Sequence, residues 1–235
     1  ALSEVIFSLA GKSAVATARQ EIESYLAGMI EARRKEPGGQ DMLAALVAVR
    51  DQGDELTETE LLNFALILLT VGHMSTANTL GTSLFMLLRR PELMQRLRDQ
   101  PDDIPATVEE LLRYNPFTLS GTQVRVATED VELGGATIHA GEAVIASLGA
   151  ANHDPAVFNS PEQLDPDRAE NPHLAFGYGV HHCLGAQLAR MELQVAIATL
   201  LRRLPGIPRL AVPEEWLTLK TGLTGHALTN LPVLW

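Results

Sequence analysis

The chain has 235 residues, 46% of them hydrophobic, and a formal net charge of −11 at pH 7. That length can bury a sizeable core in one or at most two domains, and an acidic balance without any basic run argues against nucleic acid as a partner, because phosphate contacts need clustered Lys and Arg. The one cysteine excludes an internal disulfide framework and favours a cytoplasmic location.

The first predicted elements are two amphipathic helices. Residues 1–10 carry an acid and no basic region, so no secretion signal is expected there. Apolar and charged positions alternate at helical spacing over residues 13–34, and a Pro-Gly-Gly turn ends this helix. Asp41 can cap a second, shorter helix over residues 42–50. We interpret both helices as scaffold.

A much longer helix follows. A capping box of Thr57 and Glu60 begins it and Pro91 stops it, which makes it far longer than the average of roughly 11–12 residues. Its middle, residues 64–71, is apolar on every side, which predicts burial through the centre of a protein. A membrane span is the alternative, but a Gly-His pair breaks the apolar run well short of the ~20 residues needed. We therefore expect no membrane span.

Shorter elements come after the long helix. Two short helices are predicted over residues 93–97 and 108–114, and two strands over residues 123–127 and 143–148. A Gly-Gly pair between the strands predicts a turn. One more helix begins near the cysteine and continues to about Leu204. The predicted fold class is therefore mainly α with a minor β part.

The cysteine lies in a glycine-rich stretch, residues 176–185, which reads Phe-Gly-Tyr-Gly-Val-His-His-Cys-Leu-Gly. Gly177, Gly179 and Gly185 lack a Cβ, so the backbone can turn tightly or lie flush against a flat surface. Apolar residues recur at helical spacing after Cys183, which places it at or just before a helix N-terminus, where a thiolate is favoured over a thiol. Such a cysteine can be a metal ligand, and a small buried apolar residue is the alternative.

This stretch resembles the haem-binding loop of the cytochrome P-450 superfamily, Phe-Gly-x-Gly-x-His-x-Cys-x-Gly, at all six fixed positions. The resemblance implies a cytochrome P-450 fold in which the Cys183 thiolate is the axial ligand of the iron of haem b. It also implies that His181 hydrogen-bonds a haem propionate. The haem-binding residues that it implies in this loop are Phe176, Gly177, Gly179, His181, Cys183 and Gly185.

The resemblance continues in the middle of the long helix, from Val71 to Thr76. This segment is similar to the part of the family's central helix that passes over the haem, usually Ala/Gly-Gly-x-acid-Thr. Gly72 matches a haem-side position, and Ser75 with Thr76 become candidates for proton delivery. Met74 stands where the acid usually is, and a thioether cannot relay protons. Taken alone, the hydroxyls are typical of side chains bonded to carbonyls four residues earlier.

A Glu-x-x-Arg pair, Glu110 and Arg113, lies on one face of a predicted helix, and in most proteins it would be an ordinary surface ion pair. In the family that this chain resembles, the pair is buried and is joined by a later arginine, which corresponds to Arg168. The resemblance therefore gives these three residues a structural role. It also implies that Arg125, on the first predicted strand, binds a haem propionate, a natural bidentate match for a guanidinium.

Residues of a substrate pocket are implied in the same way. Thr118 and Leu119, which follow the Glu-x-x-Arg helix, line this pocket in similar proteins. A C-terminal hairpin within residues 219–235 would bring its tip, with Leu223 and Thr224, to the same pocket. Val71 of the long helix is a further candidate.

The resemblance extends from the first helix to Trp235, yet it covers only the C-terminal portion of the family fold. We expect a single haem-binding domain over residues 1–235 and expect the N-terminal portion of the fold to be absent from this chain. Numbering that begins partway through a longer protein would explain this, and a truncated relative is the alternative.

The activity implied is that of a haem-thiolate monooxygenase of the soluble bacterial type, which activates dioxygen to hydroxylate or epoxidise an apolar small molecule such as a specialised metabolite. Electrons would come from NAD(P)H through a ferredoxin reductase and a ferredoxin. Two alternatives stay open: a non-catalytic relative that acts as a partner protein and, because of Met74, an enzyme for oxidative coupling or peroxide-driven chemistry. The acidic balance disfavours a membrane-surface protein.

Overall fold

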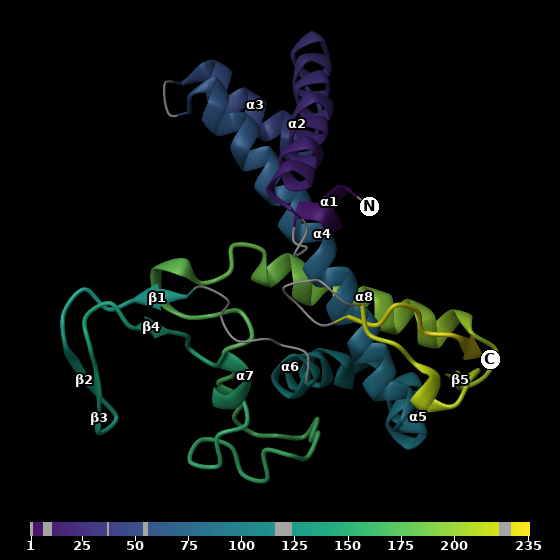
Figure 1. Ribbon diagram of the computed structural model, residues 1–235. Coiled ribbons are helices and arrows are strands. Elements are labelled where there is room, and N and C mark those ends of the chain that lie inside the picture. Colours follow the sequence, from purple (N-terminus) through teal and green to yellow (C-terminus); the bar gives the residue numbers. More distant parts are fainter. Residues whose placement is uncertain (1, 7–10, 37, 54–55, 116–123, 221–226) are drawn as a thin grey trace. The chain divides into compact units, whose positions relative to one another are not determined.

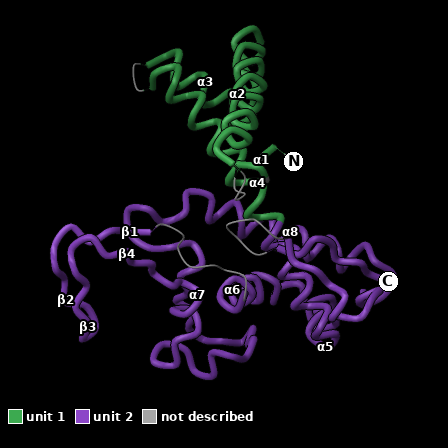
Figure 2. The backbone as a smooth tube through the Cα atoms, viewed as in Figure 1, with its two compact units in different colours: residues 1–77, 222–224 green, residues 78–221, 225–235 purple. Residues whose placement is uncertain are grey.

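The computed structural model describes residues 2–6, 11–36, 38–53, 56–115, 124–220 and 227–235 (Figure 1). The described residues form two compact units, one up to residue 77 and the other from residue 78 onward (Figure 2). Helices make up most of unit 1 and form the core of unit 2, and strands occur as short pairs. The predicted fold class, mainly α with a minor β part, is confirmed.

Unit 1 consists of helices that pack through aliphatic side chains. α1 (Leu2–Ile6), α2 (Lys12–Lys35) and α3 (Met42–Gln52) precede α4 (Glu58–Leu88), whose first part belongs to this unit. The two amphipathic helices and the long helix are therefore confirmed. The buried side chains that form its two hydrophobic clusters come from α2, α3 and α4 and are Ile22, Leu26, Ile30, Val47, Leu61, Ala65 and Leu66.

Side-chain caps explain where α3 and α4 begin. The Asp41 carboxylate accepts a hydrogen bond from the N–H of Ala44 at 2.9 Å. At the start of α4, the Glu60 carboxylate accepts the Thr57 N–H at 2.8 Å, and the Thr57 hydroxyl oxygen accepts the Glu60 N–H at 3.2 Å. Both caps use donors that have no partner within the helix, as the sequence predicts.

The middle of α4 is less buried than its sequence predicts. Ala65 and Leu66 are buried in one cluster with side chains of α2. Ile67, Leu69 and Val71 are 54%, 44% and 46% exposed. The prediction of burial on every side is wrong for these residues, because only one face of the helix packs against α2 and α3. Among the described residues, α4 is the one helix long and apolar enough to cross a membrane, a test that core helices of soluble proteins also pass.

Unit 2 is built on the end of α4 and on α5 (Pro91–Asp99), α6 (Ile104–Tyr114) and α8 (Ala186–Arg203). Their facing side chains form one aliphatic core. Its most buried members, each 0–1% exposed, are Leu87, Met94, Leu97, Val108, Leu111, Leu193 and Ile197. α6 packs against α8, so the helix with the Glu-x-x-Arg pair contacts the helix that follows the cysteine (Figure 1).

The strands of unit 2 form short antiparallel pairs. β1 (Arg125–Val126) pairs with β4 (Ala143–Val144), and β5 (Arg209–Leu210) pairs with β6 (Val233–Leu234). β2 (Val131–Leu133) and β3 (Ala136–Ile138) form a hairpin, and both glycines of its Gly-Gly turn have positive φ, 60° and 82°. A turn at this pair was predicted, and its glycines permit that backbone at little cost.

The second predicted strand is too long. Leu148 belongs to α7 (Leu148–Ala151) instead, because the Ser147 side chain accepts the Ala150 N–H at 3.3 Å and caps a helical turn. Three single-turn 3-10 helices also occur among the described residues, η1 (Pro101–Asp103), η2 (Gly179–His181) and η3 (Glu214–Trp216).

Candidate functional site

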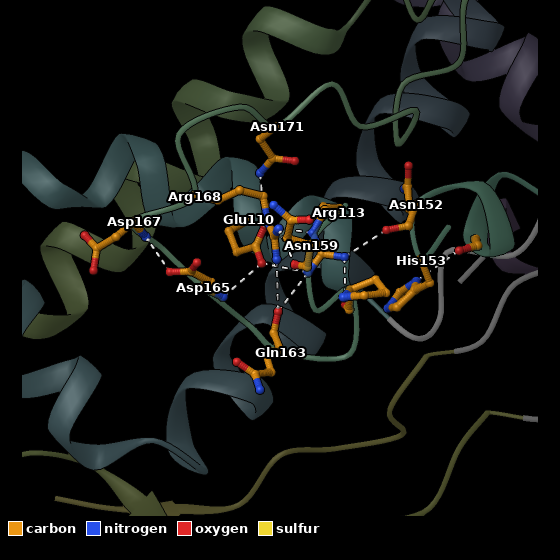
Figure 3. Close-up of polar contacts among 12 residues, drawn as sticks. Glu110, Arg113, Asn152, His153, Asn159, Gln163, Asp165, Asp167, Arg168 and Asn171 are labelled. Atoms are coloured by element: carbon orange, nitrogen blue, oxygen red, sulfur yellow. Dashed lines mark hydrogen bonds and ion pairs between the residues drawn. The ribbon is translucent and has the colours of Figure 1, made fainter. Parts of the chain in front are cut away.

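Glu110 and Arg113 form a buried ion pair on α6 (Figure 3). Arg113 Nε and Nη2 donate to the two Glu110 carboxylate oxygens at 2.8 and 2.7 Å, and neither residue is more than 1% exposed. The pair is therefore buried, as the family resemblance implies, and is not an ordinary surface pair. Arg113 also donates to the backbone carbonyls of Asn152, Pro161 and Gln163 at 2.8, 2.9 and 2.9 Å, which holds the segment after α7 against α6.

Glu110 receives three further donors from that segment. Arg168 Nε donates at 3.3 Å, the Asn171 side-chain amide at 3.0 Å and the Asp165 N–H at 2.9 Å. Burial raises the pKa of Glu110, but the hydrogen bonds and charge of its donors, chiefly Arg113, outweigh burial and hold this pKa below its usual range. Arg168 thus contacts the pair as expected. Asn171 and the Asp165 amide were not predicted, since nothing local in their sequence marks them.

The cysteine loop is closed by its own backbone. The Cys183 N–H donates to the carbonyl of Phe176 at 2.9 Å, and the Gly177 N–H donates to the carbonyl of Leu174 at 2.9 Å. Gly177 and Gly179 have φ values of 73° and 77°, which residues with a Cβ rarely adopt. α8 begins three residues after Cys183, so the cysteine lies just before a helix, as predicted.

The loop presents a single thiol to solvent. Cys183 is exposed, and its neighbours Val180 and Leu184 are 97% and 77% exposed. Within the part of the chain that the structure describes, no group of three or more His, Cys, Asp or Glu residues could hold a metal ion. A lone cysteine sulfur beside exposed apolar side chains fits a metal complex that brings its other ligands with it, as an iron porphyrin does.

The expected propionate partners, Arg125 and His181, are both exposed, on β1 and at the end of η2. Neither side chain makes a hydrogen bond or ion pair with the residues that the structure describes. Gly185 lies beside the sulfur, because a Cβ built there would be 3.9 Å from Cys183 Sγ. The Arg125 and His181 side chains are therefore available to an anionic ligand. No hydrogen bond or ion pair between β1 and the cysteine loop is found among the residues that the structure describes.

The candidates for proton delivery lie on the part of α4 that belongs to unit 1. The Ser75 hydroxyl donates to the Val71 carbonyl at 2.7 Å, the local bond that helical serines commonly make. Met74 and Thr76 are half-buried, and a Cβ built at Gly72 would meet nothing within 4 Å. The roles of these residues stay predictions.

The other candidates for the substrate pocket, Thr118, Leu119, Leu223 and Thr224, lie outside the described residues. The base of the C-terminal hairpin is described. Leu219 and Leu228 form an antiparallel bridge, and the Lys220 N–H donates to the Ala227 carbonyl at 2.7 Å.

A second polar network, next to the first, was missed from the sequence. Arg190 Nε and Nη2 donate to the Glu109 carboxylate at 2.8 and 2.9 Å, and His173 Nε2 lies 3.0 Å from the same carboxylate. The signal that could have found it is the Glu-Glu pair on α6. Successive helical residues point about 100° apart, so two adjacent acids must have different partners.

The sequence matches the profile of the cytochrome P-450 family over residues 6–104 and 104–209. The chain belongs to the cytochrome P-450 family. The cysteine loop and the buried Glu-x-x-Arg pair, at first linked to this family by resemblance, are thus parts of a cytochrome P-450 chain.

Similar cytochromes P-450 come from bacteria. Nocardicin C N-oxygenase of Nocardia uniformis is 50% identical over 221 residues, 94% of this chain and 55% of that protein. Mycinamicin IV hydroxylase/epoxidase of Micromonospora griseorubida is 49% identical over 218 residues, 93% of this chain and 54% of that protein. The crystal structure of the LnmA cytochrome P-450 hydroxylase of Streptomyces atroolivaceus has a TM-score of 0.88 at 47% identity and covers 100% of this chain and 60% of that one. This chain therefore spans about half the length of the curated relatives.

Proposed function

We propose that the protein is a haem-thiolate monooxygenase in which the Cys183 thiolate would bind the iron of haem b. The observation that carries this proposal is the exposed Cys183 thiol, which the glycine loop holds just before α8. The relatives support it, since their names are those of oxygenases and hydroxylases.

The haem, when bound, supplies the redox chemistry of dioxygen activation. The residues of the chain anchor and surround it. Cys183 provides the thiolate, and Arg125 and His181 hydrogen-bond the propionates, which suits two exposed side chains without other partners among the described residues. The residues that let the backbone approach the haem are Phe176, Gly177, Gly179 and Gly185 in the loop and Gly72 in α4.

The Glu110, Arg113 and Arg168 cluster has a structural role in this proposal. It fixes the segment between α7 and the cysteine loop to α6 through a desolvated ion pair. Residues 1–235 then form a single haem-binding domain, the C-terminal portion of the family fold. The candidates for the substrate pocket that the family resemblance implies are Val71, Thr118, Leu119, Leu223 and Thr224.

The substrate is an apolar small molecule of specialised metabolism that becomes hydroxylated or epoxidised. Two relatives support this class of substrate, because their names give nocardicin C and mycinamicin IV as the molecules that they oxidise. Electrons come from NAD(P)H through a ferredoxin reductase and a ferredoxin. The protein works in the cytoplasm, and the apolar α4 is a core helix of the fold rather than a membrane span.

The test is the visible spectrum of the full-length protein, reduced and bound to carbon monoxide. We expect the strongly red-shifted Soret band of thiolate-ligated haem, its loss in Cys183→Ala, and its retention in the control variant His182→Ala. If the full-length protein binds no haem, the proposed oxygenase activity is wrong, and the alternative of a non-catalytic partner protein remains.

A second candidate function, peroxide-driven or oxidative-coupling chemistry, differs from the first in its need for proton delivery. Met74 cannot relay a proton, and the Ser75 hydroxyl donates to the Val71 carbonyl. Both observations favour peroxide-driven or oxidative-coupling chemistry, which does not depend on an acid at position 74. In Met74→Glu, with Met74→Leu as control, a monooxygenase limited by protons should couple more reductant to product. Unchanged coupling would count against a limit on proton delivery at position 74.

A further inference from the structure

We propose that Glu109, His173 and Arg190 form a positioning network for the Cys183 loop, an inference that rests on the proposed role of Cys183 as haem ligand. The network joins α6, the segment before the loop and α8, all within unit 2. None of the three side chains makes a hydrogen bond to Cys183 among the residues that the structure describes. They act through Phe176, the residue that opens the loop.

Glu109 is the centre of the network. Both of its carboxylate oxygens accept from Arg190, at 2.8 and 2.9 Å, in the bidentate geometry that a guanidinium favours. Burial raises the pKa of Glu109, but the hydrogen bonds from His173 and Arg190 outweigh it and bring the pKa to about 2. Glu109 is therefore ionised at neutral pH, and it ties α6 to α8.

His173 adds a directional contact. Its side chain is 2% exposed, and its Nδ1 lies 3.2 Å from the backbone nitrogen of Ala175, which can only donate. Nδ1 is therefore the acceptor and the ring proton resides on Nε2, which donates to Glu109 at 3.0 Å. This tautomer fixes the ring between α6 and the backbone just before the loop.

Arg190 connects the network to the loop. Its guanidinium carbon lies 4.5 Å from the centroid of the Phe176 ring, within the range of a cation–π contact. The carbonyl of that same phenylalanine accepts the Cys183 N–H at 2.9 Å. Holding the Phe176 ring thus also holds the acceptor of the ligand's own amide, the kind of outer contact that orients a metal ligand.

The adjacent Glu110 cluster is also linked to the segment before the loop, through Asn152. The Asn152 carbonyl accepts from Arg113 at 2.8 Å, and the Asn152 side-chain oxygen accepts the Leu174 N–H at 2.7 Å. Two neighbouring glutamates of α6 therefore divide the task. Glu110 holds the segment after α7, and Glu109 holds the start of the cysteine loop.

The experiment compares Glu109→Gln with wild type in the full-length protein. The substitution would leave Arg190 without its charged partner and free it to leave Phe176. We expect the Cys183 amide to exchange its hydrogen about tenfold faster. The Ala189 amide, in the first turn of α8, should exchange at an unchanged rate. Less of the carbon monoxide complex should show the thiolate band.

Two further variants separate positioning from other effects. Glu192→Gln removes the same charge from an exposed site on α8 and should change neither the exchange rate nor the spectrum. Arg190→Lys keeps the positive charge but loses the planar fork, and it should reproduce part of the Glu109→Gln effect. If Glu109→Gln fails to fold, Arg190→Lys alone tests whether the network positions the Cys183 loop.

Two results would overturn the proposal. One is an unchanged Cys183 amide in folded Glu109→Gln and Arg190→Lys, and the other is a loss of thermal stability alone, with the exchange rate and the thiolate band as in wild type. If the wild type itself lacks the thiolate band, the proposed function fails, yet the exchange comparison still tests how the loop is held.

Discussion

Arg34 and Arg113 each bind carboxylates, but in different surroundings. Arg34, on α2 in unit 1, contacts Glu31, Asp51 and Glu58 at 2.8, 3.0 and 2.7 Å. These partners raise the pKa of Arg34, Glu58 most strongly, yet all three of their side chains are at least 36% exposed. Arg113 in unit 2 has one carboxylate partner among the described residues, and both of those side chains are buried.

The two arginines differ in what happens to the charges when an ion pair is broken. At the surface, water solvates both freed charges, and side-chain entropy opposes the pair, so exposed pairs contribute little. In the interior, removal of one partner leaves a charge without compensation, which is strongly destabilising. The number of carboxylates around an arginine therefore predicts stability less well than the solvent exposure of the pair. Substitutions at four positions test this comparison.

The largest effect is expected for Glu110→Gln. The substitution keeps the shape of the side chain but leaves the buried Arg113 charge without its partner, so the free energy of unfolding should fall by about 3–5 kcal/mol. Urea unfolding followed by circular dichroism measures this, with the exposed Glu192→Gln as control. A loss no larger than that of the control would contradict the role of the buried pair.

The effect of Glu109 on stability should be intermediate, and the pH dependence of unfolding measures it. Its pKa falls from 4.5 in the unfolded chain to about 2 in the folded protein. Between these two pH values the folded state therefore binds fewer protons than the unfolded state. The stabilisation is present above pH 4.5 and is lost as the pH falls toward about 2, by at most about 3 kcal/mol.

Urea midpoints of wild type and Glu109→Gln, measured from about pH 6 to about pH 3, check this window. The wild type should lose more stability over that range than the variant, because only the wild type has this carboxylate to protonate. Parallel pH profiles would show that Glu109 is not coupled to folding.

A helix cap at the surface should matter more than a surface ion pair. Asp41 accepts the Ala44 N–H at 2.9 Å and an Arg33 hydrogen bond at 2.7 Å. Asp41→Ala removes both and should lower the melting temperature by about 3 °C. Asp41→Asn keeps an oxygen for the cap and should stay close to wild type. Equal losses in the two variants would assign the effect to the ion pair.

The smallest effect is expected for Arg34→Gln. Three ion pairs are lost, yet the free energy of unfolding should change by less than about 1 kcal/mol, because all of the partners become solvated. The difference from wild type should shrink further in about 1 M salt, where the Debye length is roughly 3 Å. A salt-independent loss of several kcal/mol would show that this exposed network behaves like the buried pair.

Local features were well predicted from the sequence. The caps at Asp41 and Thr57, the Gly-Gly turn and the position of Cys183 just before a helix all depend on residues within a few positions of each other. Leu148 shows where local prediction failed, because a strand-like run was ended by a Ser147 cap that competes with it. The roles expected at Thr118 and Leu223 stay predictions.

The sequence by itself determined the helical architecture and, through the cysteine loop, the family, because both are encoded in short runs of residues. Only the tertiary structure decided the partners of Glu109 and what holds the cysteine loop. Glu109 meets His173 and Arg190 across 64 and 81 positions of sequence, contacts that depend on how α6 packs against α8. The exposed face of α4 has the same origin, since burial depends on neighbours that hydrophobicity alone does not specify.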